Sequence, residues 1–544
     1  MQAGTKAPFD RRAARLQTRA AVAGLKRHAI LALATLIIVL PVAVALLTGM
    51  FAGGGESWDH ILNNRLLPYT GTTVTVLALC AALATLFAVP AAGIVSTLDF
   101  PGRQTFEWAL ILPLAVPGYV MAYAWGDLSG VAGPLQTALR DATGLSARDY
   151  WFPDVYTEAG LAFVLAATLF PYVYITARAA FIQQSAALMD AARSLGAGGM
   201  NLFFRVALPC ALPAILGGLL LAMMEAAADY GAADYFGVPT LGVGIVRAWT
   251  SFGEPATAAR LALVLVLLAF LLLAMAHGLV RRRPTHTAGR LNTVNERSRL
   301  KGVKAILAIS LCGGLLSLTF FVPVGRLIWL ATEHQAGARD LIPALVSTAS
   351  LGIMGVALTL GLAFILARAA WANPGLRLGI RGIGSAGYAT PGAVLGLAAL
   401  VLVSVSGQAL SGFLALTLLL WLYATRFVSA GLEPISDRFA ATSPNLKYAA
   451  QSLGTKPLYR LWRLDLPIAR PGLLAGALIL FVEVLKELPA TWMLAPTGWE
   501  TLAVRAHTYA SDERLAAAAL PSLLITLGGL IPVWLLSTRL SQAK

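Results

Sequence analysis

Apolar residues along this chain come in long runs, and short polar stretches separate the runs. A run of about 20 apolar residues is long enough to cross the hydrocarbon core of a bilayer. The pattern repeats on both sides of a polar stretch at residues 281–304, so we predict twelve membrane-spanning helices, six in each half. The predicted spans are residues 29–50, 72–97, 105–127, 158–180, 210–232 and 258–280, then 303–331, 345–370, 380–406, 410–430, 469–490 and 515–537.

The first apolar run, Ile30 to Leu47, follows a basic stretch, as the apolar core of a secretory signal does. It is long for such a core, and no small-residue cleavage site stands out after it. We therefore expect an uncleaved first span.

The pattern divides the chain into four parts. We expect a basic tail at 1–28, a first six-helix half at 29–280, a basic linker at 281–304 and a second six-helix half at 305–544. The predicted fold class is an all-α polytopic membrane protein with about twelve transmembrane helices in two homologous halves.

One short motif occurs in both halves, 258 positions apart. The first copy reads DAARSLG at 190–196 with Pro209 thirteen residues later, and the second reads YAAQSLG at 448–454 with Pro467 at the same distance. Further positions match without a gap: Arg205/Arg463, Leu208/Leu466, Pro213/Pro471, Gly218/Gly476, Glu225/Glu483, Asp229/Glu487 and Arg247/Arg505. A repeat this long indicates two related halves and not a solenoid.

Composition and charge support a membrane protein. Of the 544 residues, 58% are hydrophobic and 12% are charged, whereas soluble domains carry about 25% charged residues. Most of the net charge of +15 lies in the tail and the linker. Flanks rich in Lys and Arg stay in the cytoplasm. We therefore expect both termini and both motif copies on the cytoplasmic side, the loop Gly126–Glu158 outside, and no nucleic-acid partner.

Several chemistries are excluded by their missing motifs. The chain has no G-x-x-x-x-G-K-[ST] phosphate loop and no H-E-x-x-H zinc motif. Its three cysteines do not have the spacing of a metal site, and its six histidines are scattered, so we expect interfacial or surface positions for the histidines. We expect no covalent catalysis, no firm metal site and no cofactor bound by this chain.

The repeated motif resembles the cytoplasmic signature loop of ABC importer permeases, E-A-A-x-x-x-G followed by proline. In that family the loop forms two short helices separated by the glycine, and the first helix docks on a separate ATPase. The matching residues are Asp190, Ala191, Ala192, Gly196 and Pro209, and Tyr448, Ala449, Ala450, Gly454 and Pro467. Asp190 and Tyr448 depart from the usual glutamate, so the resemblance implies two unequal docking contacts.

Longer stretches make the chain similar to the fused, two-copy permeases of ferric-iron importers. They are residues 112–120, 224–231, 234–240, 482–491 and 511–515. The resemblance implies a type I, MetI-like fold in a bacterial inner membrane. The implied partners are two copies of an ATPase that binds ATP and Mg, a periplasmic binding protein, the lipid bilayer, and ferric iron or another small solute. Fused permeases for thiamine or aminophosphonates share the architecture, so these solutes remain alternatives.

Two pairs of carboxylates follow the repeated motif: Glu225 with Asp229, and Glu483 with Glu487. Each pair is spaced i, i+4, so each is expected to share one helix face. Ionisable groups within a span usually face a bundle interior or a water-filled path, and oxygen ligands suit hard cations. One hypothesis is a pathway collar, with transient iron contact at Glu225 and Glu483. The other is structural pairing with Lys486, Arg247 and Arg505.

Two other classes of protein fit the apolar pattern alone. An ion-coupled secondary transporter can also have twelve spans in two parallel repeats. A membrane scaffold or receptor needs no path at all. The doubled docking loop favours the ABC importer over the secondary transporter, and the matched carboxylates favour transport over a scaffold.

Overall fold

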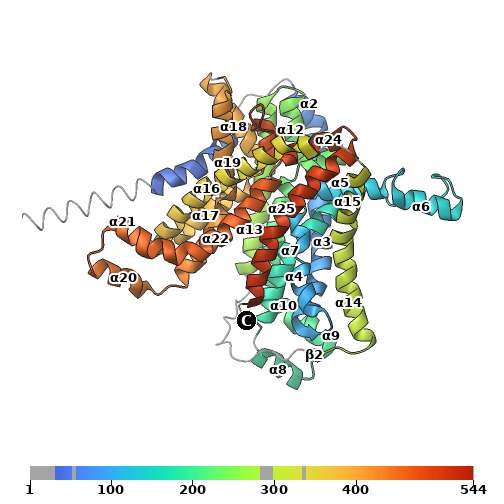
Figure 1. The fold of residues 1–544 in the computed structure, drawn as a ribbon, viewed down its shortest axis with the longest axis horizontal. Helices are drawn as coiled ribbons and strands as arrows, with labels where there is room; N and C mark the ends of the chain where they lie inside the picture. The colour runs from blue at the N-terminus through green and yellow to red at the C-terminus, as the bar shows by residue number, and fades with distance from the viewer. Residues whose placement is uncertain are drawn as a thin grey trace, which may run out of the picture. The chain divides into compact units, whose positions relative to one another are not determined.

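The computed structural model describes residues 31–51, 57–184, 186–281, 298–333, 338–407 and 409–542, and these residues are almost entirely helical (Figure 1). The predicted basic tail at 1–28 and most of the predicted linker lie outside this part of the chain.

The elements fall into a first and a second series along the chain. The first series is the helix Leu31–Phe51, α2 (Trp58–Asn64), α3 (Leu66–Thr97), β1 (Leu98–Asp99), α4 (Arg103–Ala109), η1 (Leu112–Ala115), α5 (Gly118–Ser129), α6 (Pro134–Thr143), α7 (Glu158–Ile182), α8 (Ala186–Ser194), α9 (Gly199–Leu202), η2 (Phe203–Ala207), α10 (Leu208–Ala228), α11 (Gly231–Tyr235), α12 (Leu241–Thr250) and α13 (Pro255–Arg281). The second series is β2 (Ser298–Arg299), α14 (Val303–Leu316), η3 (Ser317–Phe321), α15 (Val322–Glu333), η4 (Ala338–Leu341), α16 (Ile342–Ala372), η5 (Pro374–Leu376), α17 (Arg377–Ala389), α18 (Gly392–Ser406), α19 (Gly412–Ala440), α20 (Pro444–Ser452), α21 (Pro457–Arg460), η6 (Leu461–Asp465), α22 (Leu466–Lys486), α23 (Pro489–Leu494), α24 (Leu502–Ser511) and α25 (Leu515–Gln542).

Ten helical segments in the described residues are long and apolar enough to cross a membrane, and the number is twelve if each of two bent helix pairs counts as one span. The bent pairs are Arg103–Ala115 with Gly118–Thr143, bent by 92°, and Pro374–Ala389 with Gly392–Ser406, bent by 91°. These two pairs stand where the third and ninth spans are predicted. The predicted fold class, an all-α polytopic protein with two homologous six-helix halves, is confirmed.

The two halves repeat their elements as well as their sequence. The paired elements α8/α20, α9/α21, η2/η6 and α10/α22 begin 258 positions apart, the spacing of the motif. Beyond Tyr235 the spacing changes, because α12 begins at Leu241 and α24 at Leu502, which adds three residues. The predicted gapless match is therefore wrong at Arg247/Arg505. The longer connection between α23 and α24 makes these two arginines non-equivalent.

The chain forms two compact units that do not follow the predicted halves. The larger comprises Val44–Met354, Ala389–Leu422 and Phe481–Lys544, and the smaller comprises Met1–Ala43, Gly355–Tyr388 and Tyr423–Leu480. The unit boundary passes through α16, α19 and α22. The four predicted sequence boundaries remain predictions.

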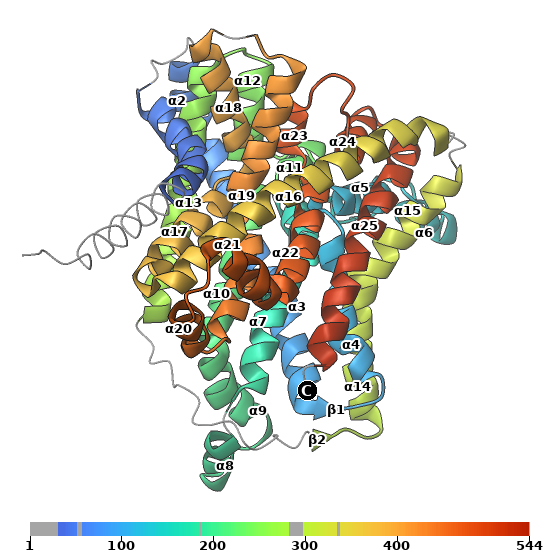
Figure 2. The same cartoon turned by 60° about the vertical axis from the view of Figure 1, so that its left-hand side comes forward.

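In the larger unit, α7 packs along both α3 and α10, and the three helices run side by side (Figures 1 and 2). A glycine allows α10 to approach α7 closely. A Cβ on Gly218 of α10 would lie 2.7 Å from the carbonyl oxygen of Tyr172 and 3.0 Å from the Cα of Val173, and it would also meet the Thr176 hydroxyl. Close helix packing through small residues is typical of membrane bundles.

Polar contacts tie the connecting segments of this unit together. The Glu254 carboxylate accepts hydrogen bonds from the Thr257 hydroxyl at 2.6 Å and from the Ser57 hydroxyl at 2.8 Å. These two bonds hold the pKa of Glu254 below its usual value. A two-residue parallel bridge also pairs Leu98 with Ser298 and Asp99 with Arg299, so it anchors the chain as it enters the second half.

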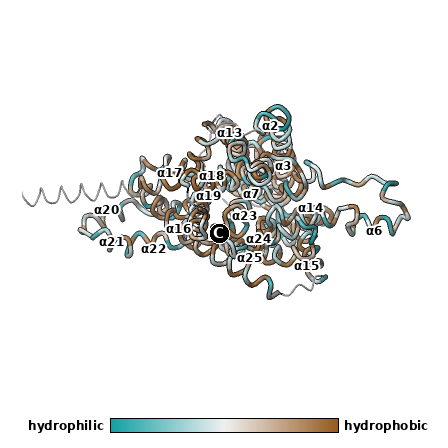
Figure 3. The backbone as a smooth tube through the Cα atoms, turned by 90° about the horizontal axis from the view of Figure 1, so that it is seen from above, coloured by the Kyte–Doolittle hydropathy of each residue, from teal (hydrophilic) through white to brown (hydrophobic). Residues whose placement is uncertain are grey.

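In the smaller unit, an apolar cluster gathers around Ile38, Leu366 and Val428, and Trp371 stacks on Phe439 with ring centroids 4.9 Å apart. Figure 3 shows apolar colour along the long helices and hydrophilic colour on short connecting elements such as α2. Large apolar side chains are also exposed on long helices, as is usual for surfaces that face lipid.

The close packing of α10 on α7 gives a first prediction. Gly218→Ala is expected to lower the free energy of unfolding by about 1–3 kcal/mol, because the added methyl group overpacks a helix contact. The neighbouring Gly217 has no atom within 4 Å of its Cβ position and supplies the matched control, so Gly217→Ala should leave stability unchanged or slightly raised. Thermal unfolding of the purified variants in detergent measures the difference. Equal midpoints for both variants would contradict this packing.

Candidate functional site

The first copy of the repeated motif folds as two short helices, α8 and α9, with a sharp turn between them. Gly196 has φ +84°, a left-handed conformation that favours glycine. The amide of Ala197 donates to the Ala192 carbonyl at 2.9 Å, and the amide of Gly196 donates to the Arg193 carbonyl at 2.9 Å. This pair of bonds is the Schellman end of a helix, so the turn expected at this glycine is present.

The second copy ends its first helix in the same way. Gly454 has φ +65°, and the amide of Thr455 donates to the Ala450 carbonyl at 3.4 Å. The Thr455 hydroxyl donates to the same carbonyl at 2.7 Å. The side chain of Tyr448, which departs from the family pattern, lies outside the described residues.

A wide helical turn joins each loop to the long helix that follows. The amide of Leu208 donates to the Phe203 carbonyl, and the amide of Leu466 donates to the Leu461 carbonyl, which are π-helical i to i−5 bonds. Pro209 and Pro467 come next, as the second residues of α10 and α22. Proline has no N–H for the next α-helical bond, so a widened turn before it leaves fewer carbonyls without a donor.

Each loop exposes three large apolar side chains at matching positions, which the sequence analysis did not identify. Leu195 and Leu453 are 89% and 81% exposed. The other matched exposed pairs are Met200 with Leu458 and Phe204 with Trp462. Asp190 is also exposed and pairs with Arg193 at 2.8 Å. In Figure 2, α8 and α9 lie beyond the ends of α7 and α10, where a partner has access to them.

The second acid of each carboxylate pair caps a short helix. Asp229 lies one residue beyond the end of α10 and accepts from the Ala232 amide at 2.9 Å. Glu487 lies one residue beyond α22, is 5% exposed, and accepts from the Ala490 amide at 3.2 Å and the Thr491 amide at 3.0 Å. The expectation that each pair shares one helix face is therefore wrong, because the chain leaves the helix between the two acids.

The first acid of each pair stays inside its long helix. Glu225 and Glu483 are both half-buried. Glu225 makes no hydrogen bond or ion pair with any residue that the structure describes. A half-buried carboxylate without a protein partner is favoured only where water or a cation reaches it.

The cations named for structural pairing have other contacts. Lys486 donates to the Leu114 carbonyl at 3.1 Å. Arg247 lies 3.9 Å from Asp234, and Arg505 pairs with Glu500 at 2.8 Å. Within the described ranges, neither arginine forms an ion pair with the four acids.

A buried polar network connects α5, α11 and α24 of the larger unit. His507 is 4% exposed, hydrogen bonds with the Tyr123 hydroxyl at 2.9 Å and lies 3.6 Å from Asp234. The surface or interfacial position expected for this histidine is wrong. Ala503, Ala506 and Ala510, which share its buried face at helical spacing, are the signal that was available in the sequence.

The part of the chain that the structure describes contains no cluster of three or more His, Cys, Asp or Glu side chains that could hold a metal ion.

Comparisons with known proteins find a family model that matches part of the chain. Residues 84–283 match the family model described as the binding-protein-dependent transport system inner membrane component. This segment contains the first loop, with α8 and α9, and the acids Glu225 and Asp229.

Curated relatives extend the likeness to most of the chain. The chain is 24% identical over 511 residues to the Fe(3+)-transport system permease protein FbpB 2 of Haemophilus influenzae, covering 91% of this chain and 95% of the relative. It is 24% identical over 484 residues to a probable ABC transporter permease, y4fN, of Sinorhizobium fredii, covering 82% of each. The molybdenum transport system permease protein ModB of Escherichia coli is 29% identical over 211 residues, which cover 37% of this chain and 89% of ModB.

The match to FbpB 2 covers both halves of this chain. The match to ModB covers 211 residues, which is less than one half of the chain. The repeated elements of this chain and the full-length match to FbpB 2 both fit a permease with two related halves in one polypeptide. Residues 84–283 are similar to the inner membrane components of binding-protein-dependent transport systems, and the chain is a multi-pass permease subunit of an ABC importer.

Proposed function

We propose that this chain forms the membrane path for ferric iron, which a periplasmic binding protein delivers and a separate ATPase drives across by alternating access. The iron assignment rests on the likeness to the Fe(3+)-transport permease over 91% of the chain. Relatives named for molybdenum and for spermidine and putrescine match shorter stretches, so another solute is the second candidate.

The matched apolar exposure of the two loops carries the coupling part of the proposal. Three pairs of large apolar side chains are exposed at equivalent places: Leu195/Leu453, Met200/Leu458 and Phe204/Trp462. Contiguous exposed apolar surface on a polar segment is typical of an interface with another protein. Two copies of an ATPase, which bind ATP and Mg, dock on α8–α9 and α20–α21 in this proposal.

The basic flanks set the orientation in the proposal. The tail and linker carry most of the positive charge and stay in the cytoplasm of a bacterial inner membrane. Six spans per half then place both termini and both loops on the cytoplasmic side, within reach of ATPases. The binding protein delivers its ligand to the opposite face.

The four acids divide into two roles along the path. Glu225 and Glu483 face the solute, since both are half-buried within long helices and Glu225 has no partner among the described residues. Asp229 and Glu487 line the same region and hold α11 and α23 through their capping bonds. Carboxylate oxygens suit a hard trivalent cation in transit.

ATP turnover in nanodiscs tests the function as a whole. The chain is reconstituted with the ATPase and binding protein encoded beside it, and turnover is measured with and without ferric iron. Stimulation by the iron-loaded binding protein alone supports the full proposal. Stimulation by another loaded binding protein keeps the ABC mechanism and replaces iron. Iron uptake that is driven by an ion gradient, without any associated ATPase, would overturn the proposal.

The coupling loops give a second prediction. Phe204→Ser combined with Trp462→Ser is expected to weaken ATPase association at least about tenfold, because burial of each aromatic side chain contributes about 1.5–3 kcal/mol. Co-purification and ATP turnover measure the loss. Trp151→Ser, at an exposed tryptophan of the loop before α7, is the matched control and should retain full association. Unchanged association in the double variant would refute docking on these side chains.

The pathway acids give a third prediction. Glu225→Gln combined with Glu483→Gln is expected to slow iron transport about tenfold, which corresponds to about 1.4 kcal/mol in the barrier, because two negative charges no longer stabilise the cation. Uptake of radioactive iron into proteoliposomes, at matched protein level and ATPase association, measures the effect. Asp59→Asn, at an exposed acid of α2, is the control. Uptake equal to wild type would assign these acids a purely structural role.

A further inference from the structure

A buried ion triad stabilises the first half where α4 meets α7. Glu107 accepts from Arg103 at 3.0 Å and also forms an ion pair with Arg178. All three side chains are largely shielded from solvent. One carboxylate thus holds two guanidinium groups at the ends of these helices.

The second half lacks this acid at the equivalent place. α4 begins at Arg103 and α17 begins at Arg377, so Glu107 corresponds to Arg381. α7 ends at Ile182 and α19 at Ala440, so Arg178 corresponds to Ser436. The triad of two arginines and one carboxylate is replaced by two arginines and one hydroxyl.

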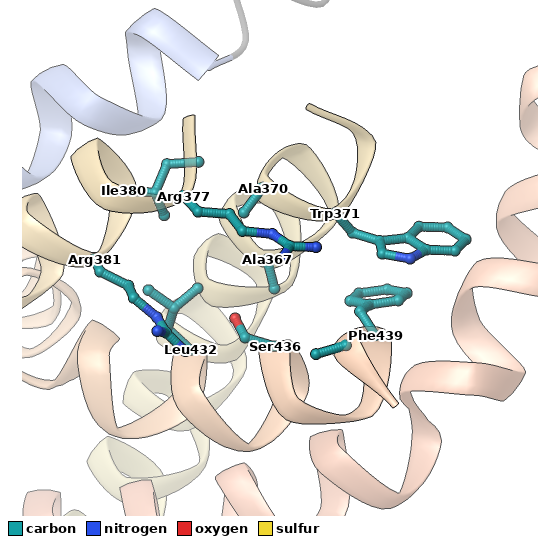
Figure 4. Close-up of a pocket in the computed structure, with 10 residues that line it drawn as sticks. Ala367, Ala370, Trp371, Arg377, Ile380, Arg381, Leu432, Ser436 and Phe439 are labelled. Carbon is teal, nitrogen blue, oxygen red and sulfur yellow. The ribbon is translucent and has the colours of Figure 1, made fainter. Parts of the chain in front are cut away.

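A cavity of about 80 Å³ lies among these replacements in the smaller unit. Figure 4 shows Arg377 and Arg381 reaching over it from α17, with the Ser436 hydroxyl on the facing helix α19. Trp371 and Phe439 form an apolar wall. The space is several times what one water molecule needs.

The charge around the cavity is positive. Arg381 lies 3.2 Å from Glu433, but both side chains are more than half exposed, and exposed pairs of this kind contribute little. Arg377 forms no hydrogen bond or ion pair with the residues that the structure describes. Asp437 and Arg438, exposed on the last turn of α19, carry opposite charges and do not line the cavity.

We propose that this cavity binds an anionic phosphate group, which takes the place that the Glu107 carboxylate fills in the first half. Two guanidinium groups and a hydroxyl supply the donors that phosphate oxygens accept, and the planar fork of arginine matches phosphate geometry. The phosphate comes from a lipid headgroup or from solution. The site does not depend on which solute the protein carries.

The position of the cavity suits a lipid headgroup. It lies where α16 and α19, two candidate spans, end and where the bent pair with α17 begins. Span ends lie at the depth of the headgroups. Leu378, next to Arg377, is 87% exposed and offers apolar surface to an acyl chain. Basic pockets between spanning helices are known binding places for anionic headgroups.

Lipid binding by the intact chain gives a fourth prediction. The purified protein is titrated with phosphatidylglycerol, with phosphatidylcholine and with inorganic phosphate, and bound lipid is counted by native mass spectrometry while the thermal midpoint is followed. Phosphatidylglycerol or phosphate should bind and raise the midpoint. Arg377→Gln should weaken this binding about tenfold, through loss of one charge-assisted bond worth about 1.4 kcal/mol.

Arg381→Glu sharpens the test, because it restores the charge pattern of the first half. Its carboxylate should pair with Arg377, abolish anion binding and make the thermal midpoint independent of phosphatidylglycerol. Arg438→Gln removes one positive charge, as Arg377→Gln does, but lies on the last turn of α19 outside the cavity lining, so it is the matched control and should bind as wild type does. Binding by phosphatidylglycerol alone assigns the headgroup, and equal binding by inorganic phosphate assigns the free ion. Wild-type anion binding in either cavity variant, or a loss in Arg438→Gln as large as in Arg377→Gln, would overturn the proposal.

Discussion

The architecture depends on one constraint: a backbone N–H that leaves a helix inside an apolar bundle must still find an acceptor. The long helices α10 and α22 both end inside the chain's bundle region and are followed by short helices. Asp229 and Glu487 accept the free amides of α11 and α23. Thr73 and Thr348 accept the first amides of α12 and α24 at 2.9 and 2.8 Å. Each break therefore has a side-chain acceptor, and it has one in both halves.

This constraint gives two of the four acids a structural role. A carboxylate with amide partners is stabilised as an anion by those bonds, so Asp229 and Glu487 have a structural reason to be present. The first residue of α11, Gly231, also packs closely. A Cβ at this position would lie 2.7 Å from Leu488 and 2.8 Å from Tyr119. Glu225 accepts no such amide bond among the described residues. A carboxylate within a membrane span is costly, so it needs water or a solute to stabilise its charge.

The sequence predicts what hydrocarbon thickness and backbone chemistry impose. Twelve spans follow from run length, and the left-handed turn at Gly196 follows from a residue without a Cβ. The shared face of Glu225 and Asp229 fails because a helix end depends on tertiary packing. The predicted equivalence of Arg247 and Arg505 fails because the second half has three additional residues before α24. The apolar pattern does not reveal this insertion. The alanines beside His507 indicate a buried helix face, but its hydrogen-bond partner Tyr123 is far away in the sequence and cannot be predicted from that pattern.

The halves keep equivalent backbone partners while their charged clusters diverge. Asp465, which is 1% exposed, forms an ion pair with Arg368 at the start of α22 in the second half. The position equivalent to Arg368 in the first half is Gly93, whose missing Cβ leaves room for the ring of Phe203. A backbone acceptor cannot be lost without an orphaned amide, whereas an ion pair and a packed ring are alternative ways to fill the same space. Divergence between fused halves is therefore expected at the span ends, next to the loops, so the two loops stand beside unequal surfaces.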